Sequence, residues 1–358
     1  MKNKKAMPLI IVLSLLAIVA IGTVCFLDHP SFGRLPRGQR LERIQKSPNY
    51  RDGQFRNQEP TQQLTSDKGL LANLINFLFS KPPRLRPDEP LPITHPQWGE
   101  TDRSEDCIAW FGHSSYLLQT AGQRILVDPV FYDAAPVSFV NRPFRHANAF
   151  RPSDLPDSID VLLITHDHWD HLDYRTVKEL RERVQHVVVP LGIGEYFEYW
   201  GYPAHKITEL DWDDSTALGP QLTIHCLPTR HFSGRGLHPN KTLWASYMVQ
   251  TDTACIYIGG DGGYDGRFRR IGQRFPHIDL AILENGQYDK DWAYIHTMPE
   301  QLGQVVRDLN PRRFITVHHS KYALAKHPWD EPLHTEQDVA RQTGMPLVIL
   351  QLGQIEKL

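Results

Sequence analysis

Clustered cysteines and a surplus of one charge are both missing from this chain of 358 residues. None of its 4 cysteines forms a C-x-x-C pair, which excludes a zinc ribbon and a spaced disulfide framework, although any two could still pair. Basic residues number 39 and acidic residues 41, so no nucleic-acid partner is expected. What is present suits a loop-rich enzyme, with 27 prolines, 13 tyrosines and 8 tryptophans.

The first 28 residues differ from the rest, because an uncharged stretch from Ala6 to Leu27 follows three lysines. At a helical rise of about 1.5 Å per residue, this stretch covers roughly 33 Å, enough to cross a bilayer. A helix buried in a protein core would usually show a polar stripe, and this one has none. We predict a transmembrane anchor over residues 1–28. A cleaved signal segment is the alternative, although its apolar core is usually only about 7–15 residues long.

The charges beside this stretch bear on its orientation. The lysines before it (Lys2, Lys4 and Lys5) favour a cytoplasmic N-terminus. Four arginines behind it act in the opposite sense, namely Arg34, Arg37, Arg40 and Arg43. Because of the lysines, we predict a single pass through the cytoplasmic membrane. The rest of the chain would then lie on the outer (periplasmic or extracellular) face.

Residues 29–105 are rich in Pro, Arg, Gln and Asn and poor in regular pattern. We expect an extended region that packs on the main domain. The exception is Ser66–Ser80, in which these apolar residues fall at helical spacing: Leu70, Leu71, Leu74, Ile75, Leu78 and Phe79. This segment is either a short helix packed on the main domain or an amphipathic element that touches a bilayer or a lipid-like substrate.

Strands and helices alternate from residue 106 to 358 without an obvious linker. Apolar and β-branched runs predict strands at 108–111, 116–119, 124–127, 161–165, 186–189, 222–227, 245–250, 255–258, 280–283, 314–317 and 347–352. Helical spacing and capping residues predict helices at 174–184, 194–200, 265–275, 299–309 and 335–343. The pattern predicts one layered α/β domain over residues 106–358.

Four potential metal ligands lie within six positions directly after the apolar run Val161–Ile164, namely His166, His168, Asp170 and His171. A strand that ends in this cluster brings imidazoles and a carboxylate to one point. Those groups are the ligands that zinc and neighbouring divalent cations prefer. A solvated polar loop is the simpler interpretation, but three His and one Asp at these offsets are rarely expected by chance with 18 histidines in the chain. The motif therefore predicts a site for one or two cations.

Further metal-capable residues follow later strands of the predicted domain, namely His231, Asp261, His296, His318 and His319. Taken singly, each has an ordinary interpretation as a loop or turn residue. Strand ends that converge on one edge of a sheet would bring them to the same site as the histidine motif.

These residues together resemble the metallo-β-lactamase-fold hydrolases. The likeness runs from Trp110–His113 through the motif and Gly260–Tyr264 to His318 and Tyr322–Leu324. Within that superfamily the chain is most similar to N-acylphosphatidylethanolamine phospholipase D and its bacterial relatives. The resemblance implies an αββα sandwich with a dinuclear site, most often zinc, with Mn²⁺ and Fe²⁺ left open.

Carried over residue by residue, the resemblance implies two metal positions. One would be held by His166, His168 and His231, and the other by Asp170, His171 and His318. Asp261 would bridge the two, and His319 is the rival of His318. A metal-bound water, whose pKa falls from 15.7 toward about 7, would supply hydroxide. Asp170 and His296 are the predicted catalytic residues, with His296 protonating the leaving group, although a structural role for His296 stays open. His113 is expected to support the ligands.

The implied activity is that of a membrane-anchored dinuclear hydrolase, a phosphodiesterase of phospholipase D type acting on lipid-like or anionic esters. A lactonase or other carboxylic-ester or amide hydrolase is the alternative, and a non-catalytic metal-binding factor of the cell envelope comes third. Loops Leu283–Tyr288 and His319–Lys321 depart from the phospholipase pattern, so the substrate is open. Lys321 could bind an anionic group or be simply solvated. An oligomer is compatible with the sequence.

Overall fold

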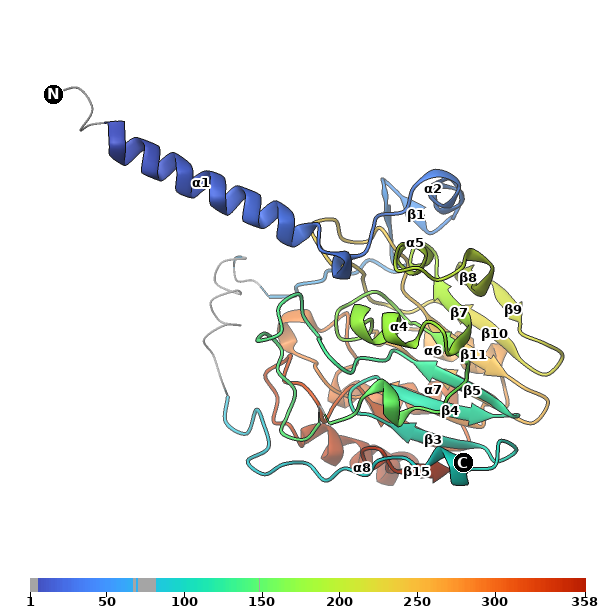
Figure 1. Cartoon of the computed structure of the whole chain (residues 1–358). Helices are drawn as coiled ribbons and strands as arrows, with labels where there is room; N and C mark the ends of the chain where they lie inside the picture. The colour runs from blue at the N-terminus through green and yellow to red at the C-terminus, as the bar shows by residue number, and fades with distance from the viewer. Residues whose placement is uncertain (1–5, 67–68, 70–81, 148) are drawn as a thin grey trace.

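Two β-sheets lie face to face in the computed structural model, which describes residues 6–66, 69, 82–147 and 149–358 (Figure 1). One sheet has the strand order β15-β3-β4-β5-β6-β7-β8 and the other β14-β13-β12-β11-β10-β9. The seven-stranded sheet contains β3 Cys107–Trp110, β4 Tyr116–Thr120, β5 Gln123–Val127, β6 Ile159–Leu163, β7 Val184–Pro190, β8 Ile207–Leu210 and β15 Ile355–Lys357. The six-stranded sheet contains β9 Ser215–Ala217, β10 Thr223–Leu227, β11 Ser246–Gln250, β12 Cys255–Ile258, β13 Leu280–Glu284 and β14 Phe314–Val317.

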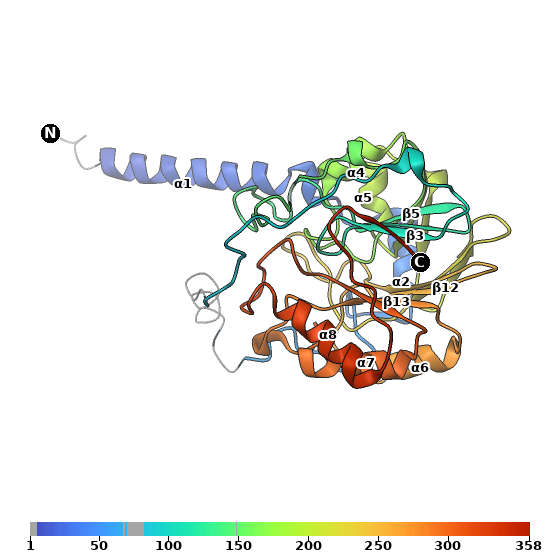
Figure 2. The ribbon, with the colours of Figure 1, turned by 90° about the horizontal axis from the view of Figure 1, so that it is seen from below.

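Helices cover the outer face of each sheet, as Figure 2 shows. The seven-stranded sheet carries α4 Tyr174–Leu180 and α5 Gly194–Tyr199, and the six-stranded sheet carries α6 Arg267–Arg274, α7 Pro299–Leu309 and α8 Glu331–Thr343. Strands such as β4 and β13 are buried along their whole length, as expected where both faces of a sheet are covered. The αββα sandwich predicted from the sequence is confirmed.

The first described helix, α1 Ala6–Leu27, extends away from the sandwich (Figure 1). Its window Ile10–Leu27 is not buried at all, so the helix is not part of the core. By length and composition it could cross a membrane, and a signal sequence would have the same properties.

The segment after α1 is docked on the sandwich by ion pairs. It contains α2 Gly38–Gln45 and the hairpin of β1 Tyr50–Arg51 with β2 Gln54–Phe55. The Arg40 guanidinium lies 2.7 Å from Oε2 of Glu195 and 2.6 Å from Oε2 of Glu209. Both glutamates are buried, and buried carboxylates are retained where they are paired. Arg40, one of the arginines that bear on the orientation of α1, is thus held by the sandwich.

Several element predictions need correction. The closing strand at 347–352 is wrong, because this run crosses between the sheets: Leu347 bridges to Phe314 at one sheet edge and Leu352 to Trp110 at the other. The strand itself is β15, three residues further on. Strands β8 and β9 and helix α2 were not predicted. Helix α4 ends earlier, since Val184 already begins β7, and α8 begins four residues earlier than expected. The helix predicted at 66–80 falls outside the described residues but for Ser66 and Gly69.

Candidate metal centre

The carboxyl ends of several strands meet at one edge of the sandwich. β6 leads to His166, β10 to His231, β12 to Asp261 and β14 to His318. In the six-stranded sheet, β12, β13 and β14 are parallel neighbours. In the seven-stranded sheet, β6 is parallel to β5 and β7. Residues that follow strands at such an edge are brought together, which is why ligand sites form there. The sequence motif and the later single residues thus arrive at the same place.

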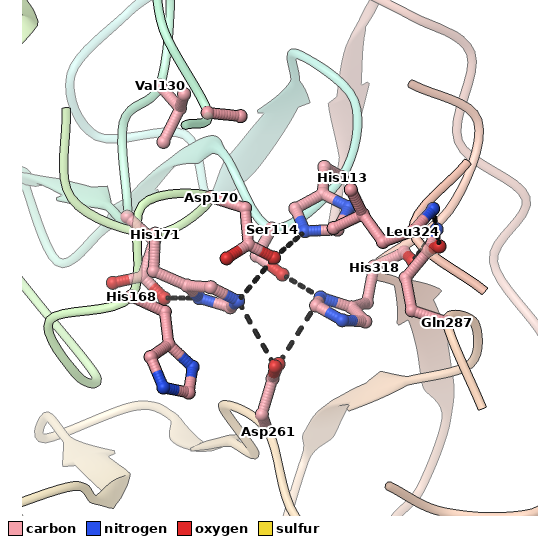
Figure 3. Close-up of polar contacts among 12 residues, drawn as sticks. His113, Ser114, Val130, His168, Asp170, His171, Asp261, Gln287, His318 and Leu324 are labelled. Atoms are coloured by element: carbon pink, nitrogen blue, oxygen red, sulfur yellow. Dashed lines mark hydrogen bonds and ion pairs between the residues drawn. The ribbon is translucent and has the colours of Figure 1, made fainter. Parts of the chain in front are cut away.

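Asp261 faces both His171 and His318 (Figure 3). Its Oδ2 is 3.2 Å from Nε2 of His171, and its Oδ1 is 3.2 Å from Nδ1 of His318. Oδ2 also lies 3.9 Å from Nε2 of His166 and 3.8 Å from Nε2 of His231. One carboxylate therefore faces histidines from both halves of the sandwich.

The donor atoms form overlapping groups, and within each group every atom lies within 4.8 Å of the others. One group comprises His166, His168 and His231. A second comprises His113, Asp170, His171 and His318. Asp261 belongs to two further groups, one with His166 and His171 and one with Glu284, His296 and His318. All seven residues predicted as ligands converge, in the two sets expected, with Asp261 between them. Their role as ligands stays a prediction.

The chemistry of these donors fits divalent cations. Among the described residues, buried Nε2 of His171, Nε2 of His318 and Oδ1 of Asp261 have no hydrogen-bond partner. Leaving a buried polar atom unpaired costs about 1–3 kcal/mol, so three such atoms at one point call for a ligand. Burial lowers the pKa of His168 to about 4 and holds the pKa of His166 and His231 well below the usual range. These imidazoles are therefore neutral at pH 7, the form that binds metals.

Asp128 orients His171 from behind. Its Oδ2 lies 2.7 Å from Nδ1 of His171, so that Nε2 is directed toward Asp261. The backbone N–H and the hydroxyl of Thr165 donate to the same carboxylate at 2.8 and 2.6 Å. Burial opposes the charge on His171, but Asp261 and Asp170 raise its pKa well above the usual value. Sequence reasoning gave Asp128 no role, although it follows β5 as the ligands follow other strands.

Asp170 is held by His113, whose Nε2 lies 2.8 Å from Oδ2 (Figure 3). Burial opposes ionisation of Asp170, but His171 and His113 bring its pKa below the ordinary value, so the carboxylate is charged. His113 has a φ of 54° and exchanges backbone hydrogen bonds with the loop after β14, donating to His319 and accepting from His318. The supporting position predicted for His113 is where the structure places it.

His318, and not its neighbour, faces the centre. Its φ is 71°, a conformation that is uncommon for a non-glycine residue and is found where the surroundings enforce it. The hydroxyl of Ser114 lies 2.9 Å from Nδ1 of His318. His319 is turned away, with Nε2 3.1 Å from Thr316 and its ring against Trp110. A Cβ on Gly286 would lie 2.4 Å from the carbonyl oxygen of His318, so only glycine fits beside this strained turn.

His231 is fixed by residues from two distant parts of the chain. Its Nδ1 lies 2.8 Å from the carbonyl oxygen of Ile295, which leaves Nε2 for the centre. The side chain of Asn57 accepts from its backbone N–H at 3.1 Å and donates to its carbonyl at 2.7 Å. Asn57 therefore positions a candidate ligand from the segment that precedes the sandwich, a contact the sequence gave no sign of.

We expect Asn57→Ala to weaken metal binding. The backbone groups of His231 would lose their partners at a cost of about 1–3 kcal/mol. Removing a supporting contact of this kind typically lowers metal affinity roughly 10–100-fold. Zinc titration of the metal-free chain against a competing chelator measures this. Asn49→Ala is the matched control, because Asn49 bonds Asp211 at 2.9 Å on the same segment and touches no candidate ligand. Equal zinc affinity in the two variants would contradict the role of Asn57.

A cavity of about 400 Å³ opens beside the centre. Its polar lining includes His168, Asp170, Asp261, His296 and His318, and its apolar lining consists of Leu64, Phe232, Trp292, Ile295 and Leu324. Nδ1 of His296 lies 2.9 Å from Oε2 of Glu284. Oε1 of Glu284 in turn accepts from the backbone N–H of Thr297 at 2.6 Å and of Gly262 at 3.0 Å. Burial opposes protonation of His296, but Glu284 raises its pKa above the usual value.

Two loops that depart from the phospholipase pattern border the centre. Gln287, in the first, lines the cavity and donates to the carbonyl oxygens of His318 at 3.3 Å and Tyr322 at 3.1 Å. In the second, both expectations for Lys321 are wrong. Its side chain is only 1 % exposed, and Nζ donates to the carbonyl oxygens of Phe111 and Val130. Lys321 thus links the segments that follow β3 and β5, and its side chain reaches neither solvent nor the cavity.

Comparisons with known proteins agree with this geometry. A family model described as "Beta-lactamase superfamily domain" matches residues 123–319, more than half of the chain. An uncharacterised protein of Mycobacterium tuberculosis is 39% identical over 295 residues, covering 81% of this chain and 78% of that protein. N-acyl-phosphatidylethanolamine-hydrolyzing phospholipase D 1 of Caenorhabditis elegans is 32% identical over 228 residues, covering 60% of this chain and 64% of its own. Among solved structures, CmlA, a diiron β-hydroxylase from Streptomyces venezuelae, matches with a TM-score of 0.55 at 19% identity, covering 72% of this chain and 55% of that one. At that identity, only the fold is shared.

Proposed function

This chain belongs to the β-lactamase superfamily of metal-dependent hydrolases, and from that premise we propose that it is a membrane-anchored dinuclear phosphodiesterase acting on phospholipid-like or other anionic esters. The observation that carries the proposal is Asp261 between two sets of buried histidines, beside a cavity that also holds His296. Two bound divalent cations would lower the pKa of a coordinated water, so that hydroxide is available at neutral pH. They would also neutralise the negative charge that develops on the ester. Zinc is the cation we favour for this donor set, and manganese and iron are the alternatives.

The residues of the chain supply position and protons. Asp128 and Ser114 hold the imidazoles of His171 and His318, and Asn57 holds the backbone of His231. Glu284 holds His296 by one nitrogen, which leaves its other nitrogen to face a substrate in the cavity. A leaving alkoxide needs a proton, and a histidine held in this way could donate it. The apolar wall of Leu64, Phe232 and Trp292 suits acyl chains better than a small polar substrate.

The substrate class draws on the resemblance to proteins named as phospholipases D. A lactonase or other carboxylic-ester or amide hydrolase is the second candidate, because the same donors would activate water against a carbonyl group. A non-catalytic metal-binding factor is the third, and the complete set of donors argues against it. We further propose that α1 is retained as a single-pass anchor, with the sandwich outside the cytoplasmic membrane, because three lysines precede the helix.

His296→Ala is expected to discriminate between leaving groups. General acid catalysis contributes roughly 10²–10⁴-fold, but only where the departing oxygen needs a proton. The variant should therefore hydrolyse diphenyl phosphate, whose phenolate leaving group is the more basic, much more slowly than the parent. It should lose far less activity with bis(p-nitrophenyl) phosphate, whose leaving group departs without a proton. Glu284→Gln should show the same bias in weaker form. An equal loss with both substrates would assign His296 a structural role.

The proposal as a whole is tested on the full chain purified in detergent. Bound metal is measured by mass spectrometry, and the same sample is assayed with bis(p-nitrophenyl) phosphate and with a lactone. About two metals per chain with phosphodiester turnover would support the proposal and justify assays with N-acylated phospholipids. Lactone turnover alone would favour the second candidate. Absence of tightly held metal, even after supplementation, would contradict the centre.

A further inference from the structure

Exposed apolar side chains gather around the base of α1. Single exposed apolar residues are normal on a protein surface and need no explanation. Here Leu35 and Leu237, which are 44% and 74% exposed, line one cavity at the base together with Leu27. A second cavity at the base joins His29 and Ser31 to Ser138, the residue before Phe139 and Val140. Phe139 is 67% and Val140 41% exposed. We call these four residues the collar.

The base of α1 is fixed relative to the collar. The indole of Trp200 donates to the carbonyl oxygen of Pro30 at 2.8 Å, and Arg235 donates to that of Ser31 at 2.9 Å. Gly33 approaches the ring of Tyr196 so closely that a Cβ would lie 2.5 Å from it. The helix therefore leaves the sandwich at a set point, and it projects from that point away from both sheets (Figures 1 and 2).

We propose that the collar lies in the surface of the bilayer that α1 crosses. This rests on the proposed anchoring by α1. Leu35 follows the end of α1 by eight residues on a docked segment, so a membrane that receives Leu27 also meets Leu35 and its neighbour Leu237. Phe139 and Val140 provide a second point of contact beside the other cavity. More than one point of contact would restrict the rotation of the sandwich about α1.

The contact places the metal centre close to the membrane. Phe32, on the docked segment, packs against Phe26 of α1 and against Trp169, with ring centroids 5.2 and 5.0 Å apart. Trp169 lies in the sequence between the candidate ligands His168 and Asp170, and the guanidinium of Arg235 lies over its ring, 4.1 Å from the centroid. One aromatic ring thus separates the base of the anchor from the metal-binding loop. The substrate class that fits this position is a lipid in the bilayer leaflet that the collar contacts.

Site-specific labels on the full chain test the collar. In a Cys25→Ser background, Phe139→Cys and Leu237→Cys are each labelled with an environment-sensitive fluorophore and reconstituted in phosphatidylcholine vesicles. Nitroxide-bearing phosphatidylcholine should quench both labels and shift their emission to shorter wavelength. Ile349→Cys is the matched control: it is 56% exposed and lies in the segment between α8 and β15. Figure 1 shows these two elements on the side of the sandwich away from α1. Its label should stay unquenched.

Other outcomes separate the collar from the anchoring. If the vesicles retain the chain but labels at 139 and 237 behave like the label at 349, the collar is wrong and the anchor stands. If the chain does not float with vesicles, anchoring and collar both fail. Shielded labels that lipid nitroxides do not quench would indicate a second copy of the chain instead. Metal content verifies the fold of each variant, and Leu35→Cys and Val140→Cys repeat the test at each point of contact.

Discussion

Asp261→Asn should lose bound metal and hydrolytic turnover together, with turnover falling by roughly a hundredfold or more. The two oxygens of Asp261 face His171 and His318, each at 3.2 Å. Burial raises the pKa of Asp261 to about 6, so the carboxylate is mostly ionised at pH 7 and carries the charge that two cations would share. An amide keeps the shape but removes that charge and replaces one acceptor with a donor. Mass spectrometry of bound metal and phosphodiester turnover measure the two effects on one sample.

The matched control for this variant is Asp252→Asn. Asp252 is exposed in the turn between β11 and β12, at the other end of the strand that leads to Asp261. It should retain the metal content and turnover of the parent chain. An Asp261→Asn variant with both metals and full turnover would refute the position of the carboxylate between two cations. Loss of turnover with both metals retained would make Asp261 a participant in the reaction and not a ligand.

The sequence predicted most of the candidate centre because its donors obey one rule. Four of them are contiguous with a strand end, and His231, Asp261 and His318 each follow a strand. The same rule would have found Asp128 after β5 and Glu284 at the end of β13. Their oxygens contact the histidines His171 and His296, and neither residue belongs to the spacing of the histidine motif.

Contacts across long sequence distances were not predictable. Asn57 and His231 are 174 residues apart, and no local pattern links them. Lys321 was missed for another reason, because lysines are almost never fully buried. Backbone carbonyls of Phe111 and Val130 satisfy its ammonium group, and burial lowers its pKa to about 7. The prediction of a closing strand at 347–352 was wrong because an apolar run can bridge two sheets as well as extend one of them.

His318 is the ligand predicted from the sequence, with His319 as its rival, and the geometry distinguishes the two neighbours. His318→Ala should lose about one metal per chain and at least roughly a hundredfold in turnover, since its Nε2 is a buried atom without a partner in the described chain. His319→Ala should keep both metals. It removes contacts to Thr316 and Ser320, so its expected effect is a loss of about 1–3 kcal/mol in the free energy of unfolding.

Backbone strain could confuse this comparison, because His318 has a φ of 71° and alanine tolerates that conformation poorly. His318→Gly removes the imidazole and accepts the positive φ without cost, so any metal lost in that variant was held by the side chain. Metal content equal to that of the parent in His318→Gly, with metal lost in His319→Ala, would reverse the assignment. The rings would then have to exchange places, which the hydrogen bonds between this loop and His113 oppose: His318 donates to the His113 carbonyl at 3.0 Å, and His113 donates to the His319 carbonyl at 2.9 Å. The pair of variants thus tests whether the strained turn exists to direct one particular histidine at Asp261.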